Sequence, residues 1–160
     1  MNFELDPAYL DLQREARAFA QSIEALAVEA DESSQVHAGV LAALQRSGLT
    51  KLMVPAQYGG RAERLDPLAI CLVREVLMAT SAHADSLFAL QGIGSYAITV
   101  AGSPRQRADW LPRVARAEAL AALALTEEGA GSDLKAVATE LKATGAGLVL
   151  RGSKSFISNG

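Results

Sequence analysis

The apolar residues of the first 118 positions recur every three or four residues, which is the spacing that places them on one face of a helix. Three of these patterns begin where a capping residue precedes a proline, at Asp6-Pro7, Asp66-Pro67 and Ser103-Pro104. Proline is favoured at the first helical position because the N–H that it lacks has no intrahelical partner there. The pattern therefore predicts an N-terminal helical domain, a bundle, over residues 1–118.

The helices of this bundle are expected in a definite order. The first runs for about six turns from Pro7, and the second ends at Gly48, because glycine is a frequent helix terminator. The third spans residues 67–81. The fourth, residues 87–101, is almost free of charge, so we expect it to be buried on all sides at the centre of the bundle. The fifth begins at Ser103-Pro104, and its apolar face includes Trp110.

Three local features accompany these helices. Residues 49–55 are expected to be short and extended, and Asp85 or a neighbour is expected to cap the fourth helix. Cys71 is the only cysteine of the chain and cannot form an internal disulfide, which is typical of a reducing compartment. It lies in an apolar helical pattern, so we expect a buried thiol.

Residues 119–160 differ from the helical part. An unbroken apolar run leads into a glycine-rich loop, and short alternating segments follow it. These features predict the first strands of a β domain, so the fold class is mainly α with an incomplete β domain. The expected strands are residues 119–125, 137–143, 148–150 and 154–158, with a glycine-containing turn at residues 144–147.

Charge and residue content exclude several classes of function. With 15 basic and 18 acidic residues the formal charge is −3, so the chain has no basic field that would attract nucleic acid. It has no apolar run long enough for a membrane span and no basic, apolar leader at its start, so we expect a cytoplasmic protein. The only histidines, His37 and His83, have no Cys, Asp or Glu partner at ligand spacing, so we expect no metal site.

The glycine-rich loop, residues 124–133, is the main candidate site. Gly129 and Gly131 leave room for a ligand to approach backbone N–H groups, and Thr126 and Ser132 add hydroxyls that can donate to a heterocycle or a phosphate. The same residues also suit a plain turn between two strands. The residues alone therefore leave both interpretations open.

Two strings of sequence resemble known signatures. Residues 124–136, ALTEEGAGSDLKA, resemble the first signature of the acyl-CoA dehydrogenase family, and residues 152–160, GSKSFISNG, resemble the next conserved block of that family. Residues 54–60, VPAQYGG, and 110–113, WLPR, are similar to further family segments. The resemblance covers essentially the whole chain.

This resemblance implies an FAD-dependent enzyme with an N-terminal helical domain, a central β-barrel domain and a C-terminal helical domain. Only the first domain (residues 1–118) and part of the second (residues 119–160) are expected here, so the chain is interpreted as part of a longer protein. The implied flavin contacts are the backbone of Leu125 and Thr126 with the Thr126 hydroxyl at the pyrimidine side, Gly131 and Ser132 at the pyrophosphate, Phe156 against the isoalloxazine ring, and Ile157 and Ser158 near its N5 edge. Ser132 is alternatively placed beside the pantetheine of the substrate.

The implied reaction oxidises the α,β bond of an acyl-CoA and transfers hydride to FAD. The resemblance implies that the catalytic base of the family lies beyond Gly160. Glu127 and Glu128 are both rejected as substitutes for this base. Glu128 also departs from the family pattern, because the family usually has proline at this position. The resemblance further implies a homo-oligomer and an electron-transfer flavoprotein as partner. Alternatives are a flavin enzyme of the same fold acting on carrier-protein thioesters or as a monooxygenase, and a non-catalytic helical association module. The 160-residue chain alone is expected to bind FAD poorly and to be inactive.

Overall fold

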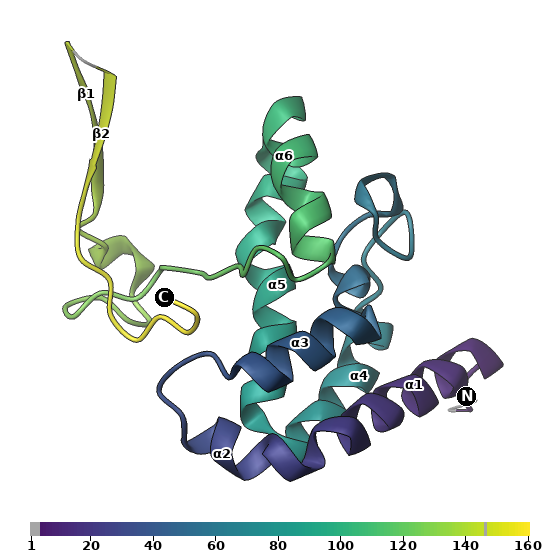
Figure 1. The fold of residues 1–160 in the computed structure, drawn as a ribbon. Coiled ribbons are helices and arrows are strands. Elements are labelled where there is room, and N and C mark those ends of the chain that lie inside the picture. Colours follow the sequence, from purple (N-terminus) through teal and green to yellow (C-terminus); the bar gives the residue numbers. More distant parts are fainter. Residues whose placement is uncertain (1–3, 146) are drawn as a thin grey trace.

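The helices form one packed body, and a β-hairpin stands apart from it in the computed structural model (Figure 1), which describes residues 4–145 and 147–160. Met1–Phe3 and Ala146, one residue of the expected turn at 144–147, lie outside the described residues. The fold is mainly α, as the sequence predicts. Its elements are α1 (Pro7–Ile23), α2 (Ala27–Glu32), α3 (Ala38–Ser47), α4 (Pro67–Thr80), α5 (Ala82–Ala101), α6 (Pro104–Ala115), β1 (Glu140–Thr144) and β2 (Gly147–Arg151).

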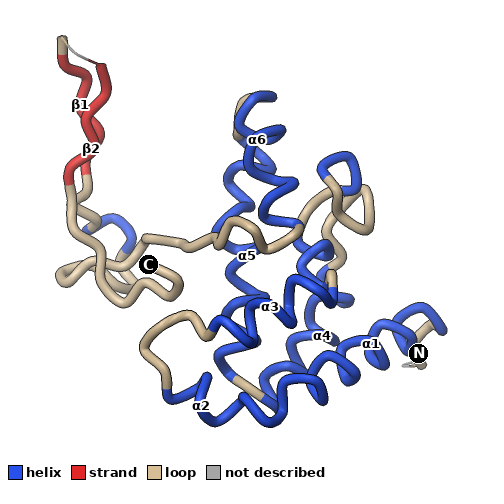
Figure 2. Tube along the Cα trace, viewed as in Figure 1, coloured by secondary structure: helices blue, strands red, loops and turns tan. Residues whose placement is uncertain are grey.

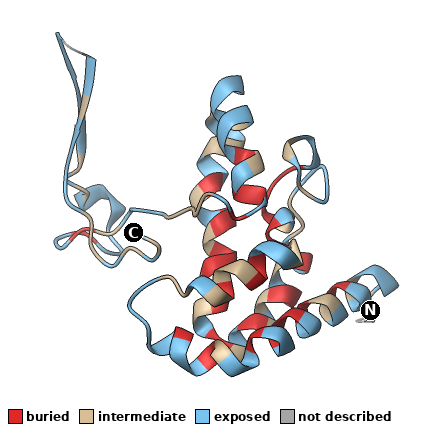
Figure 3. Ribbon diagram, viewed as in Figure 1, coloured by how far each residue is buried: buried red, intermediate tan, exposed pale blue. Residues whose placement is uncertain are grey.

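The core of the bundle lies where α1, α3, α4, α5 and α6 meet. α1 packs against α4, and α5 packs against both α4 and α6. Burial of each large apolar side chain contributes about 1.5–3 kcal/mol to folding, so this core holds the helices together. Its largest fully buried side chains include Ile23, Leu44, Leu77, Phe88 and Leu111. Figure 3 shows that the buried residues lie along the faces of the helices that point towards one another.

The predicted helix starts are confirmed. The Asp66 carboxylate accepts hydrogen bonds from the N–H groups of Leu68 and Ala69, which are the free donors of the first turn of α4. Ser103 forms a reciprocal capping box with Gln106 at the start of α6. Asp6 precedes Pro7 as expected, but its side chain makes no capping hydrogen bond.

Two predicted local structures are wrong. The first helix does not run unbroken for six turns, because a 3₁₀ turn at Glu24–Leu26 separates α1 from α2. Most of residues 49–55 are not extended, because Leu49–Met53 forms a 3₁₀ helix, and only Val54 and Pro55 have extended backbone. Gly48 reverses the chain at φ 64°, which only glycine adopts readily, and the Thr50 hydroxyl then donates to the Ala115 carbonyl at 2.8 Å. These contacts come from the distant end of α6, so local periodicity could not reveal them.

The start of α5 also differs from the prediction. The helix begins at Ala82, and its cap is Ser81, whose hydroxyl accepts from the Ala84 N–H. Asp85 is not a cap. Its carboxylate is buried, with 2% of the side chain exposed, and it accepts two hydrogen bonds from the Arg74 guanidinium at 2.9 and 2.7 Å. The sequence predicts that residues 87–101 are buried on all sides, but in the second half of α5 Ile93, Tyr96 and Val100 are about half exposed.

Two further predictions of burial are wrong. Cys71 is exposed, because α4 turns the opposite side of the helix towards the core. Trp110 is 45% exposed and does not face inward. Its ring lies 5.1 Å from the guanidinium carbon of Arg113, which places the cation over the aromatic face at the surface.

The chain beyond α6 forms fewer strands than the sequence predicts. β1 and β2 form an antiparallel hairpin in which Lys142 lies opposite Val149, and both strands are largely exposed. Residues 119–125 and 154–158 have no strand structure, which Figure 2 shows as loop. A run of apolar residues becomes a strand only when a neighbouring strand pairs with it, and none of the described residues does so here. Among the described helices, none combines the length and the apolar character needed to cross a membrane.

The side chain of Gln91 connects α5 to the segment that leaves the bundle. It is fully buried, and its amide nitrogen donates to the carbonyls of Val114 (3.0 Å) and Ala119 (2.9 Å). Its amide oxygen accepts from the Ala121 N–H at 2.8 Å. The segment passes so close to α5 that a Cβ at Gly94 would lie 2.7 Å from a backbone atom of Ala122. Gln91 and Gly94 therefore determine where the chain leaves the bundle.

We expect Gln91→Leu to lower the free energy of unfolding by about 2–4 kcal/mol, because it leaves buried carbonyls and one N–H without partners. Chemical denaturation followed by circular dichroism measures this loss. Gln21→Leu, at an exposed position of α1, is the matched control and should change stability by less than about 0.5 kcal/mol. An equal effect of both variants would contradict the role of Gln91.

Candidate functional site

The structure brings together two segments that the sequence singles out separately. The glycine-rich loop and the turn at residues 154–158 lie side by side near the C-terminal end (Figure 1). The Ser155 N–H donates to the Thr126 carbonyl at 2.9 Å, and Lys154 Nζ donates to the Leu125 carbonyl at 3.1 Å. Leu125 and Thr126 are therefore joined to the segment that carries Phe156, although the two segments are far apart in the sequence.

The glycine-rich loop is built around a tight turn. Glu127 and Ala130 exchange backbone hydrogen bonds of 3.0 and 3.1 Å, so Glu128 and Gly129 form the tip. A Cβ added at Gly129 or at Gly131 would meet nothing within 4 Å. The loop is therefore open on this side, and a ligand can approach its backbone closely.

The ring of Phe156 is the most exposed large apolar group among the described residues. It is 94% exposed, and its backbone has φ 58°, in the left-handed region. A bulky residue other than glycine rarely adopts this conformation, and such backbone strain gathers at ligand-binding sites. The turn therefore presents an aromatic face to solvent where a planar ligand can stack.

Several polar groups of the predicted site have no partner among the described residues. The hydroxyls of Thr126, Ser132 and Ser158 make no hydrogen bond there, and the N–H groups of Leu125 and Thr126 donate to no acceptor. Thr126 is half-buried, whereas Ser132 and Ser158 are exposed. These groups are available to a ligand that offers both donors and acceptors.

The predicted residues do not all come together. Gly131 and Ser132 follow the tight turn, and within the described part of the chain no hydrogen bond connects them to residues 156–158. Ile157 and Ser158 instead line a polar pocket of about 310 Å³ with the loop between α2 and α3 and the start of α5. Asn159 closes its edge by donating to the Ala121 carbonyl at 3.2 Å.

The histidines are used in helix ends beside this pocket. The His83 Nε2 accepts from the His37 N–H at 3.1 Å, and His37 Nδ1 caps α3 by accepting from the Val40 N–H. Burial lowers the pKa of His83 below its usual value, which favours the neutral ring that this contact requires. Among the residues that the structure describes, no group of three or more His, Cys, Asp or Glu side chains is placed to hold a metal ion.

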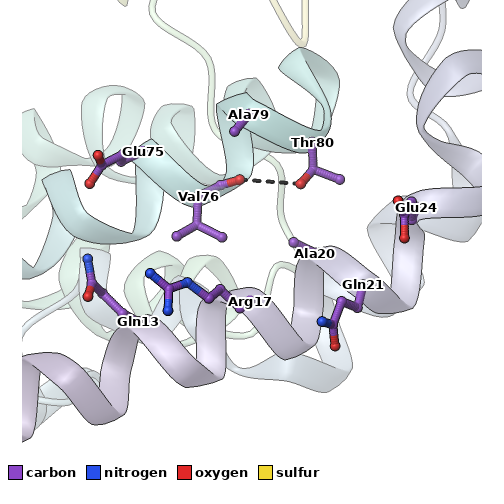
Figure 4. A pocket seen from close by; sticks show the side chains of 9 residues that line it. All are labelled: Gln13, Arg17, Ala20, Gln21, Glu24, Glu75, Val76, Ala79 and Thr80. Carbon is purple, nitrogen blue, oxygen red and sulfur yellow. Dashed lines mark hydrogen bonds between the residues drawn. The ribbon is translucent and has the colours of Figure 1, made fainter.

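A wider hollow of about 490 Å³ lies elsewhere, between α1 and α4 (Figure 4). Gln13 and Arg17 of α1 point towards α4, and Val76 points back from α4 towards α1. None of the predicted cofactor residues lines this hollow, and it is not part of the candidate site.

Glu127 is the residue of the site whose role the sequence did not reveal. Its carboxylate is 9% exposed and accepts hydrogen bonds from Lys154 Nζ (2.8 Å), the Ala138 N–H (2.7 Å), and the N–H and hydroxyl of Thr139. The Lys154 ammonium, followed by the Thr139 and Ala138 donors, lowers the pKa of Glu127 to about 2. A carboxylate held ionised in this way is a poor proton acceptor at neutral pH, which supports its rejection as a base.

We expect the contacts of Glu127 to be lost in acid. Its pKa is lowered from 4.5 to about 2 on folding, so the stabilisation is complete above pH 4.5 and disappears as the pH falls towards 2. The chemical shift of the Thr139 amide, followed by NMR from pH 6 to about 2, measures this titration. The amide of Lys135, bonded to Asp133, is an internal comparison. A Thr139 shift that titrates near 4.5 would contradict the strong hydrogen bonding.

Comparison with known proteins identifies the sequence family. The family described as "Acyl-CoA dehydrogenase, N-terminal domain" matches residues 6–118. The probable acyl-CoA dehydrogenase FadE25 of Mycobacterium tuberculosis is 33% identical over 159 residues, a match that covers 99% of this chain and 40% of the relative. The chain thus spans about two fifths of the length of this curated relative.

Solved structures show the same fold. Butyryl-CoA dehydrogenase from Megasphaera elsdenii superposes with a TM-score of 0.88 at 27% identity, over 100% of this chain and 43% of that chain. The acyl-CoA dehydrogenase from Bacillus anthracis, solved in complex with FAD, gives a TM-score of 0.85 at 26% identity, over 98% of this chain and 28% of that chain. Sequence and structure agree, and the chain therefore belongs to the acyl-CoA dehydrogenase family.

Proposed function

We propose that this chain supplies part of the flavin site of an FAD-dependent acyl-CoA dehydrogenase. The observation that carries the proposal is the exposed ring of Phe156, held at φ 58° on a turn that is hydrogen-bonded to Thr126. An isoalloxazine ring needs an apolar face to stack on and donors at its edge. Both lie here on adjacent segments.

The residues present fit FAD. The N–H groups of Leu125 and Thr126 and the Thr126 hydroxyl, all without partners among the described residues, suit the polar pyrimidine edge. Gly131 leaves the backbone open, and the free Ser132 hydroxyl beside it suits a pyrophosphate oxygen or the pantetheine of the substrate. The Ile157 backbone and the Ser158 hydroxyl complete the set near N5.

When bound, FAD would accept the hydride removed from the β carbon of an acyl thioester. In this proposal the chain's own residues hold and orient the ring, and a hydroxyl donor such as Ser158 stabilises the negative charge that develops near it. The substrate is proposed to be an acyl-CoA, the electron acceptor an electron-transfer flavoprotein, and the assembled enzyme a homo-oligomer.

The base that removes the α-proton is proposed to lie outside residues 1–160. The Glu127 carboxylate already accepts hydrogen bonds from four donors within the chain. Glu128 is exposed at the tip of the turn, where no wall of the described structure excludes water from it. Proton abstraction from carbon needs a carboxylate held within hydrogen-bond reach of its target.

We expect Phe156→Ala to weaken FAD binding about two- to twelvefold, because one stacked aromatic pair is worth about 0.5–1.5 kcal/mol. Titration of FAD with the 160-residue protein, followed by quenching of flavin fluorescence, measures the dissociation constant. Tyr96→Ala removes another exposed aromatic side chain, one on α5 that is 53% exposed, and should leave binding unchanged. If the two variants bind FAD equally, Phe156 does not stack on the flavin.

The purified 160-residue chain is expected to bind FAD weakly and to show no dehydrogenation of butyryl-CoA. The physical reason is that neither Glu127 nor Glu128 is positioned to act as a base and that the site is open to water. The assay measures reduction of an artificial electron acceptor in the presence of saturating FAD. Turnover above the rate with free FAD would place a working base among residues 1–160 and overturn this part of the proposal.

A further inference from the structure

Three separate stretches of the chain converge on the carboxylate of Glu127. It lies at the base of the tight turn, accepts from the backbone at residues 138–139, and pairs with Lys154 at 2.8 Å. The chain passes so closely here that a Cβ at Gly152 would lie 2.1 Å from the Thr139 hydroxyl. One side chain thus joins the entrance to the hairpin, the exit from it and the loop before it.

Lys154 extends this connection to the flavin-facing backbone. The same Nζ that pairs with Glu127 donates to the Leu125 carbonyl at 3.1 Å. The next residue, Ser155, donates its N–H to the Thr126 carbonyl at 2.9 Å. The ammonium therefore lies between the two segments that carry the proposed flavin contacts.

The surroundings favour a strong pair. The Glu127 side chain is 9% exposed and that of Lys154 is 20% exposed, so salt and water screen the pair less than they screen a surface ion pair. The remaining carboxylate lone pairs are taken by the Ala138 and Thr139 donors, which is the condition for a shielded ion pair to be stable.

We propose that Glu127 and Lys154 are positioning residues, whose ion pair sets the spacing between the Leu125–Thr126 backbone and the turn that carries Phe156 and Ser158. The inference rests on the proposed flavin site. In this proposal neither charged group contacts the flavin, and each acts through the backbone that it holds. Loss of the pair frees the turn from the loop. The Phe156 ring and the N–H donors of Leu125 and Thr126 then no longer keep a fixed spacing.

The chain offers matched controls. Glu128 is adjacent to Glu127 but exposed, and Lys135 is an exposed lysine of the same region. Glu127→Gln is compared with Glu128→Gln, and Lys154→Met with Lys135→Met, so that each pair makes the same chemical change. Lys154→Arg keeps the charge and the donors and tests for rescue. The bundle core contains neither residue of the pair, so circular dichroism of the helices reports that every variant is folded.

Two measurements on the 160-residue protein test the proposal. Hydrogen exchange of the Ser155 and Thr139 amides, followed by NMR without FAD, reports whether the segments are held together. Fluorescence titration with FAD reports the affinity. We expect Glu127→Gln and Lys154→Met each to speed exchange and to weaken FAD binding about tenfold, and the double variant to be no worse than either single one. Lys154→Arg should restore most of the affinity.

The outcomes separate this inference from the proposed function. If exchange in Glu127→Gln and Lys154→Met equals that in the control variants, the pair does not hold the segments and the inference is overturned. If exchange speeds up while FAD affinity is unchanged, the pair is structural only, and the flavin site stands without it. If the unmodified chain shows no saturable FAD binding, the proposed flavin site fails in this chain, and the positioning role fails with it.

Discussion

The buried amide of Gln91 fixes the point from which the chain after α6 leaves the bundle. Its three hydrogen bonds, to Val114, Ala119 and Ala121, hold the segment that leaves the bundle against α5. A buried amide left unpaired is costly, so each of these partners is effectively obligatory. Because the candidate site begins only a few residues later, its loop starts from a defined point on the bundle. The packed helical bundle thus anchors a site that is more exposed and less compact than the bundle itself.

The site itself is held together by charge rather than by apolar burial. Beyond residue 123, Glu127 and Ala130 are the only buried residues in the described part of the chain, and the hairpin strands are exposed on both faces. The ion pair of Glu127 with Lys154 and the hydrogen bonds around it replace a hydrophobic core there. Such a site depends on a few directional contacts, so single substitutions affect it more sharply than they affect the bundle.

Predictions from the sequence succeeded where the signal is local. The helix starts at Pro67 and Pro104 follow from cap chemistry, and the start at Pro7 follows from the fit of proline to the first helical position. The end of α3 at Gly48 follows from the freedom of glycine at positive φ. They failed where a distant partner decides. Examples are the 3₁₀ helix at Leu49–Met53, bonded to the end of α6, and Asp85, whose cap-like position is overridden by Arg74. Periodicity also shows that a helix has an apolar face without showing which elements pack against it. For this reason the sequence wrongly predicted burial of Cys71 and Trp110, which are exposed.

The sequence by itself determined that this chain is a helical domain followed by a short β segment, which two family signatures it carries, and which residues are candidates for a flavin. Those features rest on interactions within a few residues or on residue identity. Only the tertiary structure decided that the two signatures lie side by side, that Phe156 is presented at a strained turn, and that Glu127 pairs with Lys154. The physical reason is that partners 27 residues apart in sequence, as these two are, meet only through the path of the folded chain.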